Sequence, residues 1–69
     1  MQLIELLEQT RKDQQLTQSE MAARLSVSES YYSYLVNGKR MINHMTLAGI
    51  VRSFPELEPA VIQALRGEN

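Results

Sequence analysis

The sequence predicts an all-α fold, a compact single domain of four or five short helices in a chain of 69 residues. Apolar residues recur every three or four positions, and no segment alternates apolar and polar residues as a half-buried strand does. Thr17 and Ser28 each precede such a periodic run, where an N-cap residue is expected. Asn37-Gly38 marks a helix end, because both residues tolerate the left-handed backbone.

The first two helices are expected over about residues 2–12 and 18–25, separated by a short exit at 13–15. Thr17 and Glu20 have the spacing of a capping box, and Leu16 and Met21 have the spacing of the accompanying hydrophobic staple. The residues expected on the inward faces of these helices are Leu3, Leu6, Leu7, Thr10, Met21, Ala22 and Leu25.

The remaining helices follow a short turn at Ser26 and Val27. A third helix is expected from Ser28 to about Val36, and a polar, basic loop over 39–44. A fourth helix is expected to begin at residue 45 or 46 and to end at Pro55, because the residue before a proline avoids helical geometry. Pro59 suits the first turn of a fifth helix. The apolar positions of these last two helices are Leu47, Ile50, Val51, Phe54, Val61, Ile62 and Leu65.

Composition excludes several classes of protein. With no cysteine the chain forms no disulfide and no thiolate metal site, and His44 stands alone, so we expect no metal, no cofactor and no enzyme. No apolar run approaches the roughly 20 residues that cross a bilayer, and the first residues do not resemble a signal peptide. We therefore expect a cytoplasmic protein. The net charge of −1 and the pI near 5.7 count against nucleic acid as a partner.

The segment 17–40 has the spacing of a helix-turn-helix, two short helices joined by a turn of three or four residues. Ala22 is small where the helices approach, and Val27 and Leu35 close the core between them. This segment resembles the Cro and phage-repressor (Xre-like) family, and the likeness extends over about 7–54. The matching residues are Arg11, Thr17, Gln18, Glu20, Ala22, Leu25, Val27, Ser28, Leu35, Asn37, Gly38, Lys39, Arg40, Thr46, Leu47, Ile50 and Phe54.

The resemblance implies a lambda-repressor-like domain that binds double-stranded DNA and regulates transcription in a bacterium or phage, most simply as a repressor. Its recognition helix, about 28–36, would lie in the major groove. The base-facing residues would be Glu29, Ser30, Tyr31, Ser33 and Tyr34. The phosphate-contacting residues would be Gln18, Ser28, Asn37, Lys39, Arg40, Asn43 and His44. Tyr32 matches an apolar, buried position of the family.

The base-facing set is unusual because it lacks the arginine or lysine that commonly reads guanine. Glu29 can accept a hydrogen bond from the cytosine amino group, and the tyrosine rings can pack on thymine methyls. Two other positions depart from the family. Ser26 stands where glycine is preferred, so the serine must accept some backbone strain or a slightly different turn. Val36 stands where an acid often pairs with the arginine at position 11, so Arg11 is expected to lose that partner.

Two questions stay open at this stage. The C-terminal segment 55–69, with Phe54, could make a homodimer contact through Phe54, Leu57, Val61, Ile62 and Leu65, or these residues could only cap the core of one protomer. The scaffold could also serve as a protein-interaction module, with Tyr31, Tyr34 and Val36 as the patch for a protein partner. The acidic pI favours that alternative, whereas Gln18 and the Lys39-Arg40 pair favour DNA.

Overall fold

The computed structural model describes residues 3–67, which form helices and no strand. The elements are α1 (Leu3–Asp13), α2 (Gln18–Arg24), α3 (Glu29–Val36), α4 (His44–Ser53), the 3₁₀ turn η1 (Pro55–Leu57) and α5 (Glu58–Leu65). The all-α prediction is confirmed, and the helix boundaries agree to within two residues. The expected start of the first helix at Gln2 lies outside the described residues. None of the described helices has the length and apolarity to cross a membrane.

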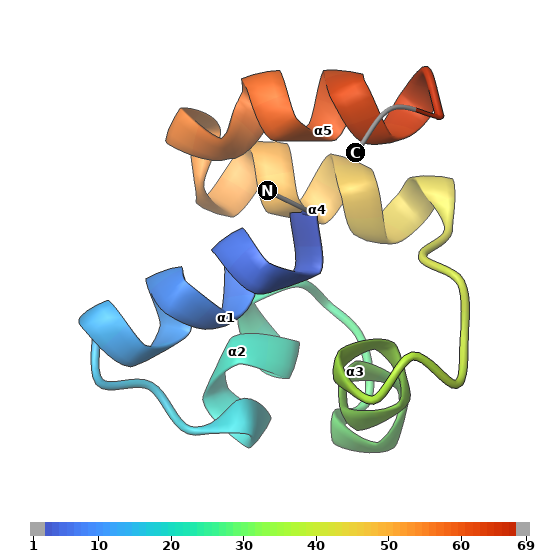
Figure 1. Ribbon diagram of the computed structural model, residues 1–69. Coiled ribbons are helices and arrows are strands. Elements are labelled where there is room, and N and C mark those ends of the chain that lie inside the picture. The colour runs from blue at the N-terminus through green and yellow to red at the C-terminus, as the bar shows by residue number, and fades with distance from the viewer. Residues whose placement is uncertain (1–2, 68–69) are drawn as a thin grey trace.

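The helices lie in two groups (Figure 1). In one group α4 and α5 pack side by side and are joined by η1, and in the other α2 packs on α3. The first helix, α1, contacts both α3 and α5 and so joins the groups. This arrangement leaves the outer face of α3 uncovered at one end of the molecule, on the far side of α4 from α5 (Figure 1).

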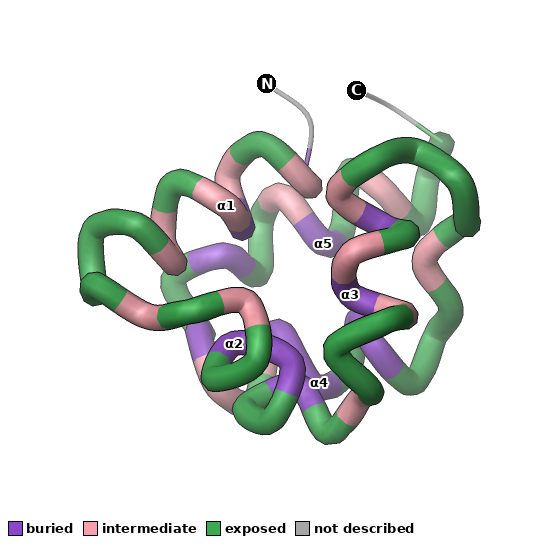
Figure 2. Tube along the Cα trace, turned by 90° about the horizontal axis from the view of Figure 1, so that it is seen from below, coloured by how far each residue is buried: buried purple, intermediate pink, exposed green. Residues whose placement is uncertain are grey.

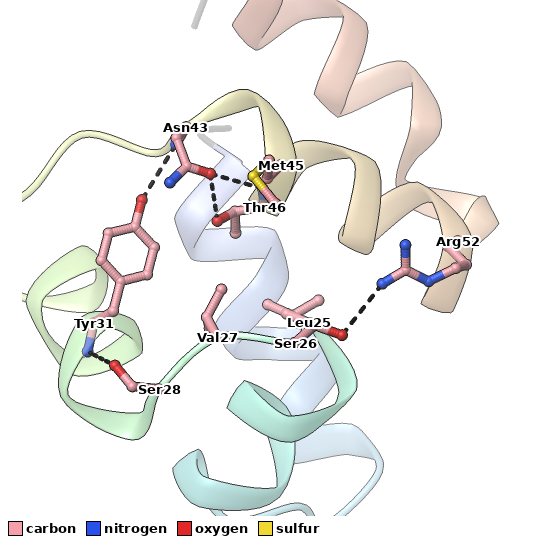
Figure 3. A pocket seen from close by; sticks show the side chains of 9 residues that line it. All are labelled: Leu25, Ser26, Val27, Ser28, Tyr31, Asn43, Met45, Thr46 and Arg52. Atoms are coloured by element: carbon pink, nitrogen blue, oxygen red, sulfur yellow. Dashed lines mark hydrogen bonds between the residues drawn. The ribbon is translucent and has the colours of Figure 1, made fainter.

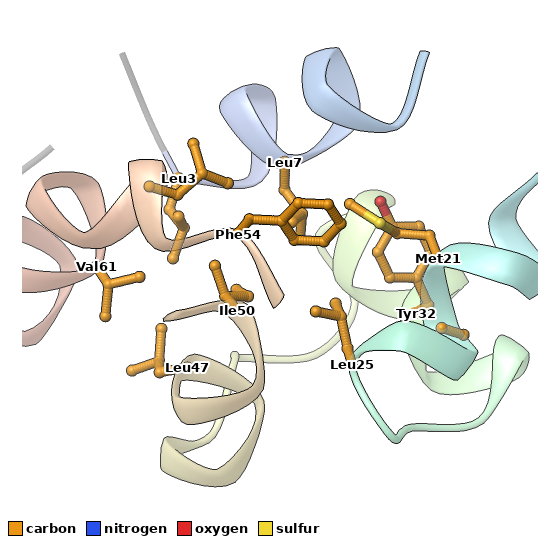
Figure 4. Close-up of a cluster of buried hydrophobic side chains, with 11 residues drawn as sticks. Leu3, Leu7, Met21, Leu25, Tyr32, Leu47, Ile50, Phe54 and Val61 are labelled. Carbon is orange, nitrogen blue, oxygen red and sulfur yellow. The ribbon is translucent and has the colours of Figure 1, made fainter. Parts of the chain in front are cut away.

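A single core holds the two groups together (Figure 4). Its fully buried side chains come from helices α1 to α4 and from the residues directly after α2 and α4. They are Leu7, Met21, Leu25, Tyr32, Ile50 and Phe54. Figure 2 shows these buried positions on the inner sides of the helices, with exposed positions around the rim. The predicted inward faces are confirmed at Met21, Ala22 and Leu25, whereas Leu6 and Thr10 are only half-buried.

The proposed dimer residues divide into two sets. Phe54, Leu57 and Val61 are 2%, 8% and 4% exposed, so they fill the core of one protomer and are not available for a contact with a second copy. The physical reason is η1, which the sequence did not predict and which turns α5 back onto α4. Ile62 and Leu65, at 41% and 56%, remain on the surface.

Side-chain caps define where the helices begin. The predicted capping box is confirmed, because the Thr17 hydroxyl accepts from the Glu20 amide at 3.1 Å and the Glu20 carboxylate accepts from the Thr17 amide at 2.8 Å. Ser28 caps α3 by accepting from the Tyr31 amide. The start of α4 was predicted too late: Asn43 caps it by accepting from the Thr46 amide at 2.8 Å, so His44 is its first residue and not part of the loop.

Helices α1, α2 and α3 end in the same way, on a residue with left-handed backbone. Gln15, Ser26 and Gly38 have φ of 57°, 61° and 73°. At each end the next amide bonds back five residues; the Val27 amide, for example, donates to the Ala22 carbonyl at 3.0 Å. The expected strain at Ser26 is confirmed, since this backbone region costs a residue with a side chain roughly 1–2 kcal/mol. The third end is unstrained because glycine occupies it.

A polar network joins α1 to α3. The Glu8 carboxylate accepts from the Tyr32 hydroxyl at 2.6 Å and from the Arg11 guanidinium at 2.7 and 3.0 Å. Arg11 also donates to the Leu16 carbonyl at 2.8 Å. Arg11 thus loses the family's usual partner at position 36, as expected, but gains Glu8 from its own helix. The hydrogen bond from Arg11 holds the pKa of Glu8 below its ordinary value, and burial together with the Glu8 hydrogen bond raises the pKa of Tyr32.

Candidate nucleic-acid interface

The outer face of α3 forms one shallow groove with the start of α2. The groove has a volume of about 300 Å³ and is lined by Gln18, Glu29, Ser30, Ser33 and Tyr34. Residues 29, 30, 33 and 34 share a face because they lie one turn apart on the helix. Thus four of the five predicted base-facing residues are brought together with one predicted phosphate-contacting residue. The groove presents a carboxylate, an amide and three hydroxyls.

The loop after α3 brings a cation to this groove. The Arg40 guanidinium carbon lies 5.9 Å from the centre of the Tyr34 ring, a cation–π contact. The chain can return to this position because of the turn at Gly38, where the Lys39 amide donates to the Tyr34 carbonyl at 2.8 Å. Lys39 and Arg40 are both exposed. The loop therefore places a cation at the edge of the outer face of α3.

The fifth predicted base-facing residue, Tyr31, does not line this groove. It lies in a neighbouring groove of about 470 Å³ between the start of α3 and the start of α4 (Figure 3). Its hydroxyl donates to the Met41 carbonyl at 3.1 Å and accepts from the Asn43 amide at 3.2 Å. Tyr31 is half-buried, whereas Tyr34 is exposed. The two tyrosines are three residues apart, yet they face different surroundings.

The predicted phosphate-contacting residues are in two different situations. The oxygens of Ser28 and Asn43 are occupied as helix caps, and the Asn37 side-chain amide donates to the Ser33 hydroxyl at 3.4 Å. Of the other members of the set, Gln18 is half-buried, and Lys39, Arg40 and His44 are exposed. The two cations of the set, Lys39 and Arg40, thus lie in the α3–α4 loop.

Comparison with protein families agrees with this geometry. A helix-turn-helix family model matches residues 7–60, from the middle of α1 into α5. The chain belongs to the Xre/Cro-like helix-turn-helix family. It is therefore a DNA-binding helix-turn-helix regulator with a lambda-repressor-like fold. Comparisons with curated proteins and with solved structures give no significant match.

The alternative of a protein-interaction module on this helix-turn-helix scaffold stays a prediction, and the three residues of its patch lie in different surroundings. Tyr31, Tyr34 and Val36 line three separate grooves, and Val36 packs partly against the core. Within residues 3–67, no three histidine or acidic side chains gather as a metal site requires.

The hydrogen bonds of Glu8 and of Tyr31 are among the features of the helix-turn-helix domain that were not predicted. The Glu8–Arg11 pair has the i, i+3 spacing of a helical ion pair, so its signal was present in the sequence. The bond of Tyr31 to the loop had no such signal, because it joins residues ten and twelve positions apart.

Proposed function

We propose that this protein is a sequence-specific repressor that places α3 in the major groove of its operator. The observation that supports this most is the continuous face of Gln18, Glu29, Ser30, Ser33 and Tyr34, with Arg40 stacked at its edge. A recognition helix reads bases with its exposed side chains while neighbouring cations hold the phosphates. A protein bound to an operator that overlaps a promoter would exclude RNA polymerase from that promoter.

The chemistry of the face predicts how bases are read. Glu29 is an acceptor and suits the cytosine amino group, and Ser30 and Ser33 can bond to either kind of base edge. The exposed Tyr34 ring can pack on a thymine methyl. The negative charge of Glu29 repels nearby phosphates, so it lowers affinity while restricting which sequence is accepted. The outer face of α3 therefore contributes more to sequence specificity than to affinity.

Affinity then depends on the phosphate contacts of Lys39 and Arg40, assisted by Gln18 at the start of α2. Replacing both cations by alanine is expected to weaken binding to all duplexes alike and to reduce the dependence of log K on log salt by about two per protomer. Tyr34→Ala is expected instead to change the order of preferred sequences. The measurement is fluorescence anisotropy with labelled duplexes at several salt concentrations.

Arg66→Ala is the matched control, because it removes an exposed cation from the end of α5, away from α3 (Figure 1). It should leave the affinity and the salt dependence near those of the unmodified chain. Equal losses from Arg66→Ala and Arg40→Ala would show that net charge, rather than the loop, governs binding.

We propose further that the protein acts as a homodimer through the outer face of α4 and α5. An apolar groove of about 440 Å³ lies there. Its accessible apolar residues are half-buried Val51 and exposed Leu65, and the core residues Leu47 and Val61 lie against it. Exposed Ile62 also lies on α5. Pairing two such domains on half-sites one helical turn apart adds the contacts that one domain lacks.

Leu65→Glu tests this dimer. Leu65 is 56% exposed, so the charge should not disturb the fold of one protomer. Sedimentation equilibrium is expected to show a dimer for the unmodified chain and a monomer for the variant, which should bind a two-fold site at least about tenfold more weakly. A monomeric unmodified chain at micromolar concentration would contradict this part of the proposal.

A further inference from the structure

We propose that Tyr31 is a positioning residue, whose hydroxyl fixes the α3–α4 loop so that Lys39 and Arg40 face the phosphates when α3 faces the bases. This inference rests on the proposed function, because it gives the loop cations their role on DNA. It assigns to Tyr31 a part different from the base-facing one expected from the sequence.

The geometry of the hydroxyl supports this assignment. It donates to the Met41 carbonyl at 3.1 Å and accepts from the Asn43 amide at 3.2 Å, so one side chain of α3 binds two backbone groups of the loop. Figure 3 shows the second of these bonds. A phenol has a single proton to donate, and here that proton is directed at Met41. Tyr31 can therefore donate to a base or a phosphate only by releasing the loop.

The loop is fixed on both sides of its two cations. Before Lys39, the turn at Gly38 is held by the bond from the Lys39 amide to the Tyr34 carbonyl. After Arg40 come the two bonds of Tyr31, and then the cap in which Asn43 accepts from the Thr46 amide and hydroxyl, both at 2.8 Å. Tyr31 is thus the link between the recognition helix and the capped start of α4.

A fixed loop favours binding because its residues are ordered before DNA arrives. If the two bonds of Tyr31 are removed, the loop regains backbone freedom, and that freedom must be lost again when the cations dock on phosphates. Phosphates have the same chemistry in every sequence. The loss of affinity should therefore be the same for preferred and non-preferred duplexes.

Tyr31→Phe tests the inference, because it keeps the ring and removes only the hydroxyl. We expect affinity for all duplexes to fall by about five- to tenfold, with the order of preference among single-base operator variants unchanged. Exchange of the Asn43 amide proton, followed by NMR without DNA, should become faster. Tyr34→Phe is the matched control: it should leave Asn43 exchange unchanged and act only through the groove on α3.

The outcomes are distinct. A changed order of sequence preference in Tyr31→Phe would make Tyr31 a base-reading residue and overturn the inference. Faster Asn43 exchange with unchanged affinity would also overturn it, because the bond would then be structural only, while the proposed function would stand. Failure of the unmodified chain to bind any duplex would overturn the proposed function itself, and with it this inference.

Discussion

Glu8→Ala is expected to lower the free energy of unfolding by about 2–4 kcal/mol. The Glu8 and Arg11 side chains are each only 16% exposed, and Tyr32 is fully buried. Removing the carboxylate leaves the Tyr32 hydroxyl without its acceptor and Arg11 without its counter-charge. A domain of 69 residues has roughly 3–10 kcal/mol of stability in all, so the loss should be evident as a large fall in the urea midpoint.

Glu8→Gln separates the charge from the hydrogen bond. The glutamine can still accept from Tyr32, so its loss should be smaller than that of alanine. The folded chain holds the pKa of Glu8 below its ordinary value of 4.5, through the hydrogen bond from Arg11. The stabilisation is therefore complete above that value and is lost as the pH falls through the lower, folded value. As the pH falls from above 4.5 through the lower, folded pKa of Glu8, the unmodified chain should lose more stability than Glu8→Gln. Parallel curves for the two proteins would contradict the role of the charge.

Gly49→Ala is expected to destabilise the fold by about 1–3 kcal/mol, although alanine is the better helix former by about 1 kcal/mol. Gly49 lies inside α4, where an added Cβ would stand 2.9 Å from the Leu25 carbonyl oxygen. That oxygen is backbone at the end of α2, next to the strained turn at Ser26. The turn between α2 and α3 would have to move away from α4, and thermal unfolding should show a lower Tm.

Ala48→Gly is the matched control for this contact. Ala48 is the neighbouring residue of α4 and is exposed, so glycine there should cost about 1 kcal/mol through helix propensity alone. Alanine should thus be the more stabilising residue at position 48, and glycine the more stabilising residue at position 49. If Gly49→Ala instead raised the Tm, helix propensity would dominate, and the close packing of the turn on α4 would contribute nothing to the free energy of unfolding.

The fold was largely predictable because its signals are local. The capping box at Thr17, the cap at Ser28 and the stop at Gly38 each depend on residues within one helical turn, and all three are confirmed. The position of α5 was not predictable in the same way. An apolar residue at helical spacing can face the core or a partner, and only the turn of η1 decided that Val61 faces the core while Leu65 does not.

The candidate site was predictable to a similar extent. Spacing along α3 correctly grouped residues 29, 30, 33 and 34, because they share one face. Spacing failed at Tyr31, whose surroundings are set by a loop that folds back ten residues later. The cation over Tyr34 was missed for the same reason, since Arg40 reaches the ring through the turn at Gly38.

The acidic composition is compatible with DNA binding because of where the charges lie. The chain has a net charge of −1, but Lys39 and Arg40 lie together beside the recognition helix. Binding should then rest on few phosphate contacts rather than on bulk positive charge. Both the strength of binding and its response to salt should accordingly be modest for a DNA-binding domain.

Binding of the unmodified chain to a mixed-sequence duplex between about 50 and 200 mM salt tests the central claim most directly. We expect detectable binding at the lowest salt and a linear fall of log K with log salt. The slope should be about −2 per protomer from Lys39 and Arg40, with a smaller slope when both are alanine. Absence of binding to any duplex at low salt would contradict the claim that this face of α3 is a DNA-binding surface.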